Sequence, residues 1–173
     1  YVCYDNEAYM NTGIQRSSST PLLAWTTTTP EHHPKQVPKK DIMEIMAAHR
    51  IPYAATATVA YPEDLVAKVR RARETRGSKF INILSSCPTG WQTRPQDSIR
   101  VSRLAVTTNV YPLYEVFDGV RRVLRDNPHP RPVKEYLEIQ GRFHHLEEKD
   151  ILTIQAHVDE AWSQLRGRAD ELV

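Results

Sequence analysis

The most constraining feature of this sequence is a regular alternation of β-prone and helix-prone segments in its first half. Tyr1-Val2-Cys3-Tyr4 is a short apolar run typical of a buried strand. Further strands are predicted at residues 52–57 and 80–84, and helices at 41–50 and 62–76. Strands separated by helices usually pair in parallel through right-handed crossovers. The sequence therefore predicts an α/β fold with a parallel sheet and flanking helices.

Each of the two predicted helices has apolar residues at helical spacing, which indicates a buried face. The faces consist of Ile42, Ile45, Met46 and His49 in the first helix, and of Leu65, Val66, Val69 and Ala72 in the second. The second helix begins with Pro62 and is followed by Gly77, as is typical of helix ends. Its arginines lie largely opposite the apolar face, where we expect a solvated surface; they are Arg70, Arg71, Arg73 and Arg76.

The second half contains a helix, a hairpin and a helical tail. We predict a short helix at 98–109, and two β-prone runs at 113–117 and 120–124 around the turn Asp118-Gly119. Prolines then form a stiff linker, and an amphipathic helix follows that docks on its own domain or on a partner subunit. This organisation predicts three parts: a main domain at 1–110, a hairpin and Pro-rich linker at 111–131, and a helical tail at 132–173.

Composition excludes several classes of protein. The net charge is +2 and no apolar run approaches the ~20 residues of a membrane-spanning helix, so we expect neither nucleic-acid nor membrane binding. Only two cysteines are present, Cys3 and Cys87, which argues against a disulfide framework and favours the cytoplasm. Because the chain opens with Tyr1 inside a strand, we also expect that further sequence precedes it.

Two segments could carry chemistry at the carboxyl edge of the predicted sheet. Asn6 and Asn11 follow the first strand, where ligands bind in open α/β sheets. Their amide oxygens and the nearby backbone carbonyls could bind a Mg²⁺ ion that holds phosphate. Alternatively, these residues form an ordinary turn. Cys87 follows the strand at 80–84 and is either a small buried thiol or a ligand of an iron–sulfur cluster.

The remaining candidates are weak. The histidine pairs at 32–33 and 144–145 lack zinc-site spacing, and we expect these side chains to face solvent. The long polar segment at 9–38 is either a functional loop or disordered, and Trp25 within it favours a packed loop. No nucleophile elbow, P-loop, dinucleotide fingerprint or CxxC pair occurs, so hydrolase and nucleotide-kinase functions are poorly supported.

Long motifs resemble a known family. Residues 4–21, from Tyr4-Asp5-Asn6-Glu7-Ala8 onward, closely resemble the beta subunit of pyruvate:ferredoxin oxidoreductases (pyruvate synthases). The further matching stretches are 24–30, 40–42, 48–49, 51–53, 87–91 and 112–115, in family order. The sequence departs from the family pattern at Arg50, Ser86 and Leu22-Leu23, which leaves the cofactor positions intact and the preferred 2-oxo acid open.

The resemblance implies the C-terminal part of a thiamine-diphosphate-binding domain. In this family the side chain of Asn6 and the backbone carbonyl of Ala8 would ligate Mg²⁺, and Asn11 would lie near the reactive thiazolium carbon as a catalytic residue. The run that would line the cofactor is Asn6, Glu7, Ala8, Tyr9, Met10 and Asn11. Cys87 matches the last ligand of a 4Fe-4S cluster. The remaining cluster ligands and a Gly-Asp-Gly motif would lie outside this chain.

The function implied by the resemblance is the oxidative decarboxylation of pyruvate with coenzyme A to acetyl-CoA and CO₂, with electrons passed through the cluster to ferredoxin. The implied partners are other oxidoreductase subunits of alpha, gamma and delta type, or the upstream half of the beta subunit, and we expect the chain alone to be inactive. Two alternatives stay open: the same chemistry on oxalate or a branched-chain oxo acid, or a truncated, non-catalytic assembly module.

Overall fold

One six-stranded sheet runs through the protein, which we describe from a computed structural model covering residues 1–173. The strand order is β1-β3-β2-β4-β5-β6, and β3 pairs in parallel with both β1 and β2. The strands are β1 (Val2–Asp5), β2 (Tyr53–Thr58), β3 (Lys79–Leu84), β4 (Tyr114–Phe117), β5 (Arg121–Leu124) and β6 (Glu171–Leu172). The predicted parallel α/β core is therefore confirmed, and an antiparallel extension is added to it.

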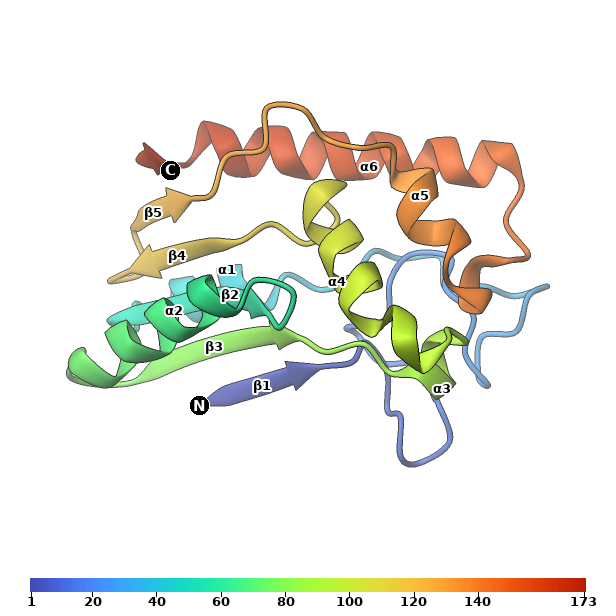
Figure 1. Ribbon diagram of the computed structural model, residues 1–173, viewed down its shortest axis with the longest axis horizontal. Coiled ribbons are helices and arrows are strands. Elements are labelled where there is room, and N and C mark those ends of the chain that lie inside the picture. Colours follow the sequence, from blue (N-terminus) through green and yellow to red (C-terminus); the bar gives the residue numbers. More distant parts are fainter.

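Helices cover both faces of this sheet (Figure 1). Helix α2 (Pro62–Glu74) packs on one face, where Ala72 joins a cluster with Ala55 and Ala57 of β2 and the isoleucines of β3. On the other face, α1 (Ile42–Ala48) and α6 (Glu148–Gly167) pack against β2, β4 and β5. The shorter helices are α3 (Pro88–Trp91), η1 (Pro95–Asp97), α4 (Ser98–Thr107), α5 (Val133–Glu138) and η2 (Gly141–Phe143). A larger core joins α4, α5 and α6 beside the carboxyl edge of the sheet.

Local sequence explains the helix ends. Asp41 caps α1 by accepting a hydrogen bond from the Glu44 amide, and Glu147 and Asp150 form a reciprocal capping box at the start of α6. In α6, the predicted apolar residues Ile154, Val158 and Leu165 are buried. Helix α6 therefore packs against α4, α5 and the sheet. No helix is both long and apolar enough to span a bilayer.

The burial of the first strand was predicted wrongly. Strand β1 lies at the edge of the sheet, where Tyr1 and Tyr4 are exposed, because β3 is its only partner. An apolar run signals a strand, but its burial depends on neighbours that the run itself does not specify.

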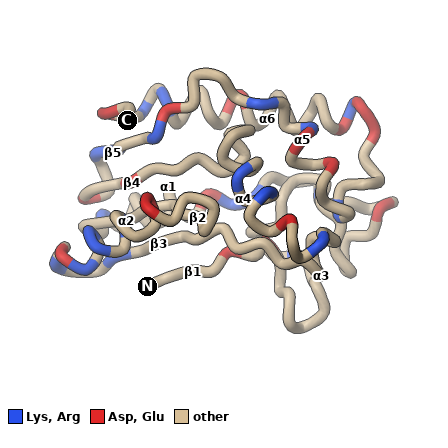
Figure 2. Tube along the Cα trace, in the orientation of Figure 1, with Lys and Arg blue, Asp and Glu red and all other residues tan.

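The predicted helix faces were also partly wrong. In α1 the buried residues are Met43 and Ala47, whereas Ile45 is exposed. In α2 the buried pair is Lys68 and Ala72. Val66 and Val69 of the predicted face are exposed. Arg70, Arg71, Arg73 and Arg76 are exposed as expected, although Arg71 also pairs with the buried Glu115. Figure 2 shows Lys and Arg gathered around the end of α2 and the start of β3.

The predicted hairpin joins the main sheet. Strands β4 and β5 pair antiparallel, and β4 adds directly to β2 through Tyr53↔Phe117 and Ala55↔Glu115. Strand β6, which the sequence pattern did not predict, pairs with β5. The division of the chain into 1–110, 111–131 and 132–173 stays a prediction.

Candidate functional site

The carboxyl ends of β1 and β3 lie side by side and define the edge where we predicted the site. Asp5 is in register with Leu84, and the Ser85 amide donates a hydrogen bond of 3.0 Å to the Asp5 carbonyl. The two candidate segments, residues 6–13 and 85–91, therefore leave the sheet from adjacent strand ends. In Figure 1 the loop after β1 extends beyond this edge, next to α3.

The segment after β1 is a tight, well-connected loop. Glu7 adopts a left-handed backbone conformation with φ +68°, and its carbonyl accepts a 2.7 Å hydrogen bond from the Thr20 hydroxyl. The Asn6 side-chain oxygen accepts a 3.4 Å hydrogen bond from the Ala8 amide. A residue other than glycine at positive φ persists only where surrounding contacts hold it. The loop is thus held in shape, and Asn11 at its tip is exposed.

The Cys87 segment forms a short helical turn that contacts this loop. Cys87 is the N-cap of α3, and its sulfur accepts a hydrogen bond from the Gly90 amide at 3.4 Å. The fully buried Trp91 donates its indole N–H to the Asn6 carbonyl at 2.9 Å. Met10 lies so close to Gly90 that a Cβ there would overlap its sulfur. The structure therefore brings together the two segments that sequence analysis singled out.

Buried charges anchor the loop from below. Asp5 and Glu7 are 5% and 3% exposed, and Lys39 bridges them with N–O distances of 2.6 and 2.8 Å. The second Glu7 oxygen accepts a 2.6 Å hydrogen bond from Arg142, which is 2% exposed. Both oxygens of the Glu7 carboxylate are thus engaged inside the protein. Any contact of Glu7 with a cofactor has to come from its backbone.

The pKa values of these groups follow from their pairing. Burial alone would raise the pKa of the Glu7 carboxyl, but the charges and hydrogen bonds of Lys39 and Arg142 together hold it below its usual value. For Lys39 the opposite holds: burial would lower its pKa, and Glu7 and Asp5 raise it. Within this cluster, the Glu7 carboxyl therefore stays ionised and the Lys39 amine stays protonated at neutral pH.

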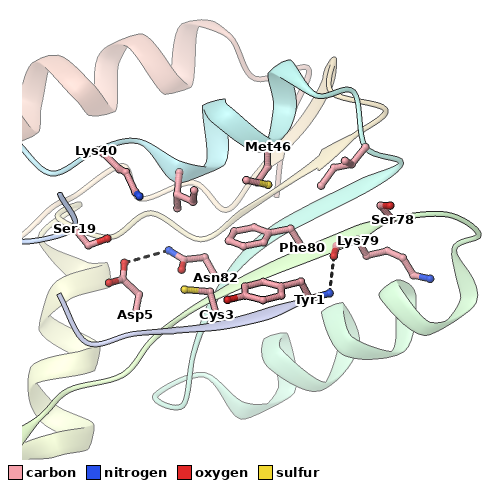
Figure 3. Close-up of a pocket in the computed structure, with 12 residues that line it drawn as sticks. Tyr1, Cys3, Asp5, Ser19, Lys40, Met46, Ser78, Lys79, Phe80 and Asn82 are labelled. Atoms are coloured by element: carbon pink, nitrogen blue, oxygen red, sulfur yellow. Dashed lines mark hydrogen bonds between the residues drawn. The ribbon is translucent and has the colours of Figure 1, made fainter. Parts of the chain in front are cut away.

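A groove of about 430 Å³ lies beside this cluster, between α1 and the strands β1 and β3. In Figure 3 Asn82 points toward Asp5, to which its amide donates at 3.4 Å. Cys3 lines the same groove, and burial together with the nearby Asp5 carboxylate raises the pKa of its thiol. Cys3 therefore stays protonated, as expected of a structural cysteine rather than a ligand.

The residues present fit the implied cofactors in part. The Ala8 carbonyl accepts no hydrogen bond within the chain, and the Asn6 side-chain oxygen accepts only the long one from Ala8. Two such oxygens on a fixed loop suit the hard ion Mg²⁺. The partly buried Cys87 sulfur, with an amide hydrogen bond, suits a cluster thiolate. No group of three metal-ligating side chains occurs, so either metal would need further ligands from outside the chain.

Sequence reasoning missed the residues that hold the site together. Lys39 and Arg142 read as ordinary basic residues, and no local pattern connects Glu7 with a residue 135 positions later. The Gly90-Trp91 dipeptide within the family motif was the available signal for α3. The histidine prediction also needs correction, because both ring nitrogens of His145 are buried without a hydrogen-bond partner. The other members of the two pairs, His32, His33 and His144, are exposed as expected.

Comparison with known proteins gives the family. Residues 1–83 match the model of the thiamine pyrophosphate enzyme C-terminal TPP-binding domain. The chain is 48% identical to ketoisovalerate oxidoreductase subunit VorB of Pyrococcus furiosus, over 98% of this chain and 56% of VorB. It is 51% identical to pyruvate synthase subunit PorB of Methanocaldococcus jannaschii, over 92% of this chain and 55% of PorB. It is also 50% identical to PorB of Methanothermobacter thermautotrophicus, over 96% of this chain and 59% of that PorB.

The chain thus spans little more than half the length of these relatives, but it matches them over nearly its whole extent. The alignment with VorB, over 98% of this chain, therefore includes both candidate segments. The protein belongs to the family of thiamine pyrophosphate enzymes that includes the PorB and VorB oxidoreductase subunits.

Proposed function

We propose that this chain is the C-terminal part of the beta subunit of a pyruvate:ferredoxin oxidoreductase and supplies half of its cofactor site. The reaction is the oxidative decarboxylation of pyruvate with coenzyme A to acetyl-CoA and CO₂, and the electrons go to ferredoxin. The observation that carries the proposal is the direct contact between the loop at 6–13 and the Cys87 turn, made by Trp91 with Asn6 and by Met10 with Gly90. A thiamine site and a cluster ligand would need this closeness for electron transfer.

The chain's own residues have separate tasks in this proposal. Asn6 and the Ala8 carbonyl hold Mg²⁺, and the run from Glu7 to Met10 forms the wall along the diphosphate. Asn11, exposed at the loop tip, offers its amide to charge that develops on the substrate. Cys87 ligates a 4Fe-4S cluster. When bound, thiamine diphosphate supplies the electron sink for decarboxylation, and the cluster accepts the electrons.

The remaining ligands and the Gly-Asp-Gly motif come from the rest of the beta subunit or from alpha-, gamma- and delta-type partner subunits. The proposed location is the cytoplasm. Because half of the site lies elsewhere, the proposed activity belongs to the assembled complex. Within the helical tail at 132–173, the buried face of α6 packs on α5 and, with it, on α4, so the tail completes the core of the domain.

The test uses the assembled complex with the complete beta subunit and compares Cys87→Ser with the matched control Cys3→Ser. Iron, acid-labile sulfide, thiamine and Mg²⁺ are measured together. We expect Cys87→Ser to lose one cluster and Cys3→Ser to keep it. Equal iron content in the two variants would contradict the assignment of Cys87. A complex without thiamine or iron would favour the non-catalytic assembly module.

Two asparagine variants divide the roles within the loop. Asn6→Ala should weaken the retention of thiamine diphosphate and Mg²⁺, whereas Asn11→Ala should slow turnover with little loss of cofactor. Gln36→Ala, which removes an exposed side-chain amide outside the loop at 6–13, serves as the control. Equal cofactor content and equal turnover in the two asparagine variants would refute this division.

A branched-chain 2-oxo acid is the second candidate substrate. The identity to a ketoisovalerate oxidoreductase subunit, 48%, is close to the 51% found for a pyruvate synthase subunit. A panel of pyruvate, 2-ketoisovalerate and oxalate, compared by kcat/KM on the assembled complex, decides between them. A preference for 2-ketoisovalerate would replace pyruvate in the proposal and leave the cofactor roles unchanged.

A further inference from the structure

Arg142 is a buried cation in the segment that links α5 to α6. It lies in η2, is 2% exposed, and donates from Nη2 to the Glu7 carboxylate at 2.6 Å and to the Tyr136 hydroxyl at 3.3 Å. Its Nε donates to the Gln140 side chain at 2.9 Å. Several polar partners around one guanidinium leave little freedom for the side chain. Arg142 is therefore held in one orientation.

The same guanidinium also lies over the Trp91 ring in the Cys87 turn. The guanidinium carbon is 3.9 Å from the centre of the Trp91 ring, and that ring donates its N–H to the Asn6 carbonyl. Arg142 thus contacts Glu7 in the loop through a hydrogen bond and Trp91 in α3 through a cation–π contact. Only a planar cation can form hydrogen bonds in its plane and stack on a ring at the same time.

The backbone around Arg142 attaches the segment to the same two places. The Gly141 amide donates to the carbonyl of Gln92, the C-cap of α3, at 3.1 Å. The Arg142 carbonyl accepts from the Trp25 amide at 2.9 Å, in the long loop. A Cβ on Gly141 would lie 2.6 Å from the Gln92 Cβ, so the two backbones approach closely. The segment is fastened on both sides of the candidate site.

We propose that Arg142 is a positioning residue that fixes the loop carrying Asn6 and Asn11 against the turn carrying Cys87. The inference rests on the proposed function, because the distance between the loop and the turn affects catalysis only if they hold thiamine diphosphate and the cluster. Arg142 contacts Glu7 and Trp91, and Trp91 in turn donates a hydrogen bond to Asn6, the residue before Glu7. These contacts restrain one another. Loss of the Arg142 guanidinium removes two of them at once.

Lysine and methionine variants separate charge from shape. Arg142→Lys keeps the positive charge but cannot stack and bridge together, and Arg142→Met keeps most of the bulk without charge. The second variant leaves Glu7 buried with Lys39 as its only cation, so its fold is at greater risk. Arg131→Lys is the matched control, because Arg131 is exposed and pairs only with Glu135 on the surface.

The experiment measures three properties of the assembled complex with the complete beta subunit. They are the affinity for thiamine diphosphate, the electron paramagnetic resonance spectrum of the reduced clusters, and the thermal midpoint. For Arg142→Lys we expect about tenfold weaker thiamine binding, the lower end of the range for residues that orient metal ligands. We also expect a broadened or shifted spectrum for the cluster that loses iron in Cys87→Ser. The control should match the wild type in all three properties.

Two results would overturn the inference in different ways. If Arg142→Lys lowers only the thermal midpoint and keeps the wild-type affinity and spectrum, Arg142 is merely structural and the proposed function stands. If the wild-type complex binds neither thiamine nor the cluster, the proposed function fails and the inference fails with it. If Arg142→Met does not assemble, the lysine variant and Trp91→Phe, which removes the N–H donor to Asn6, still provide the test.

Discussion

Lys39 offers the most direct test of the charge arrangement beneath the loop. Its ammonium bridges the Asp5 and Glu7 carboxylates, whose side chains are 4% and 3% exposed, while Lys39 itself is 24% exposed. Replacing it by methionine keeps the apolar stem and removes the charge. The almost fully buried Asp5 and Glu7 carboxylates then both lose the ammonium that bridges them. The variant Lys39→Met should therefore destabilise the fold at neutral pH.

The size of the effect follows from the contacts that remain. Removing one partner from a buried ion pair costs about 3 to 5 kcal/mol. Glu7 keeps Arg142, and Asp5 keeps the Glu7 amide at 3.1 Å and the Asn82 amide at 3.4 Å. These remaining partners place the expected loss near the lower end, about 3 kcal/mol. Asp5→Asn combined with Lys39→Met should recover part of it, because it removes the less well compensated charge.

The loss should also depend on pH. The pKa of Glu7 lies below its usual value in the folded protein, so its pairing stabilises the fold above the unfolded value of about 4.5, and this contribution disappears as the pH falls through the folded pKa. Without Lys39 the pKa of Glu7 rises and protonation relieves the uncompensated charge. The difference between wild type and Lys39→Met should shrink from pH 7 to pH 4.

Urea unfolding followed by tryptophan fluorescence at both pH values measures these differences. Lys40→Met is the control, because Lys40 is the exposed neighbour and forms no ion pair. A loss below about 1 kcal/mol at pH 7, the value of a surface pair, would refute the argument. A loss of the same size at pH 4 and pH 7 would also refute it.

Two further predictions concern alkaline stability and the contact between the site segments. Burial raises the pKa values of four tyrosines, which are Tyr53, Tyr111, Tyr114 and Tyr136. Above pH 10 the free energy of unfolding should therefore fall by about 1.4 kcal/mol per pH unit for each of these tyrosines. Absorbance titration near 295 nm should show them ionising only on unfolding, and their titration in the folded protein would contradict this. Gly90→Ala should displace Met10 and weaken thiamine binding by the complex with little loss of stability. Unaltered binding in Gly90→Ala would show that this contact is dispensable.

The central strands and helices could be predicted because their signals are local. Residues 52–57 and 80–84 are mainly apolar runs, broken only by Thr56 and Asn82, and they form strands β2 and β3, each with a partner strand on both sides. Pro62 and the acidic residues after it marked the start of α2 correctly. The turn Asp118-Gly119 likewise produced the hairpin. In each case the evidence lies within a few residues of the element that it predicts.

Burial could not be predicted in the same way. Lys68 is buried on α2 because its ammonium donates to the Thr56 carbonyl and to Asp64, whereas the hydropathy pattern had assigned Val66 and Val69 to the core. Whether a charged residue is buried depends on partners from another element, and the pattern within one helix contains no information about them. The edge position of β1 escaped prediction for the same reason.

The motif after β1 shows how the same limit applied to the site. In sequence, Asp5, Asn6 and Glu7 form a polar run followed by Ala8, and the pattern does not show where the two acids point. In the structure the acids turn inward and pair with Lys39 and Arg142, and the residues between and after them keep their oxygens available. Two carboxylates and two cations cancel, so the anchor adds no net charge beneath the loop. An ion held by Asn6 and Ala8 would then be balanced by the groups bound with it and by ligands from outside this chain. The acids of the motif therefore hold the loop in place, and its neutral residues are the ones left to bind.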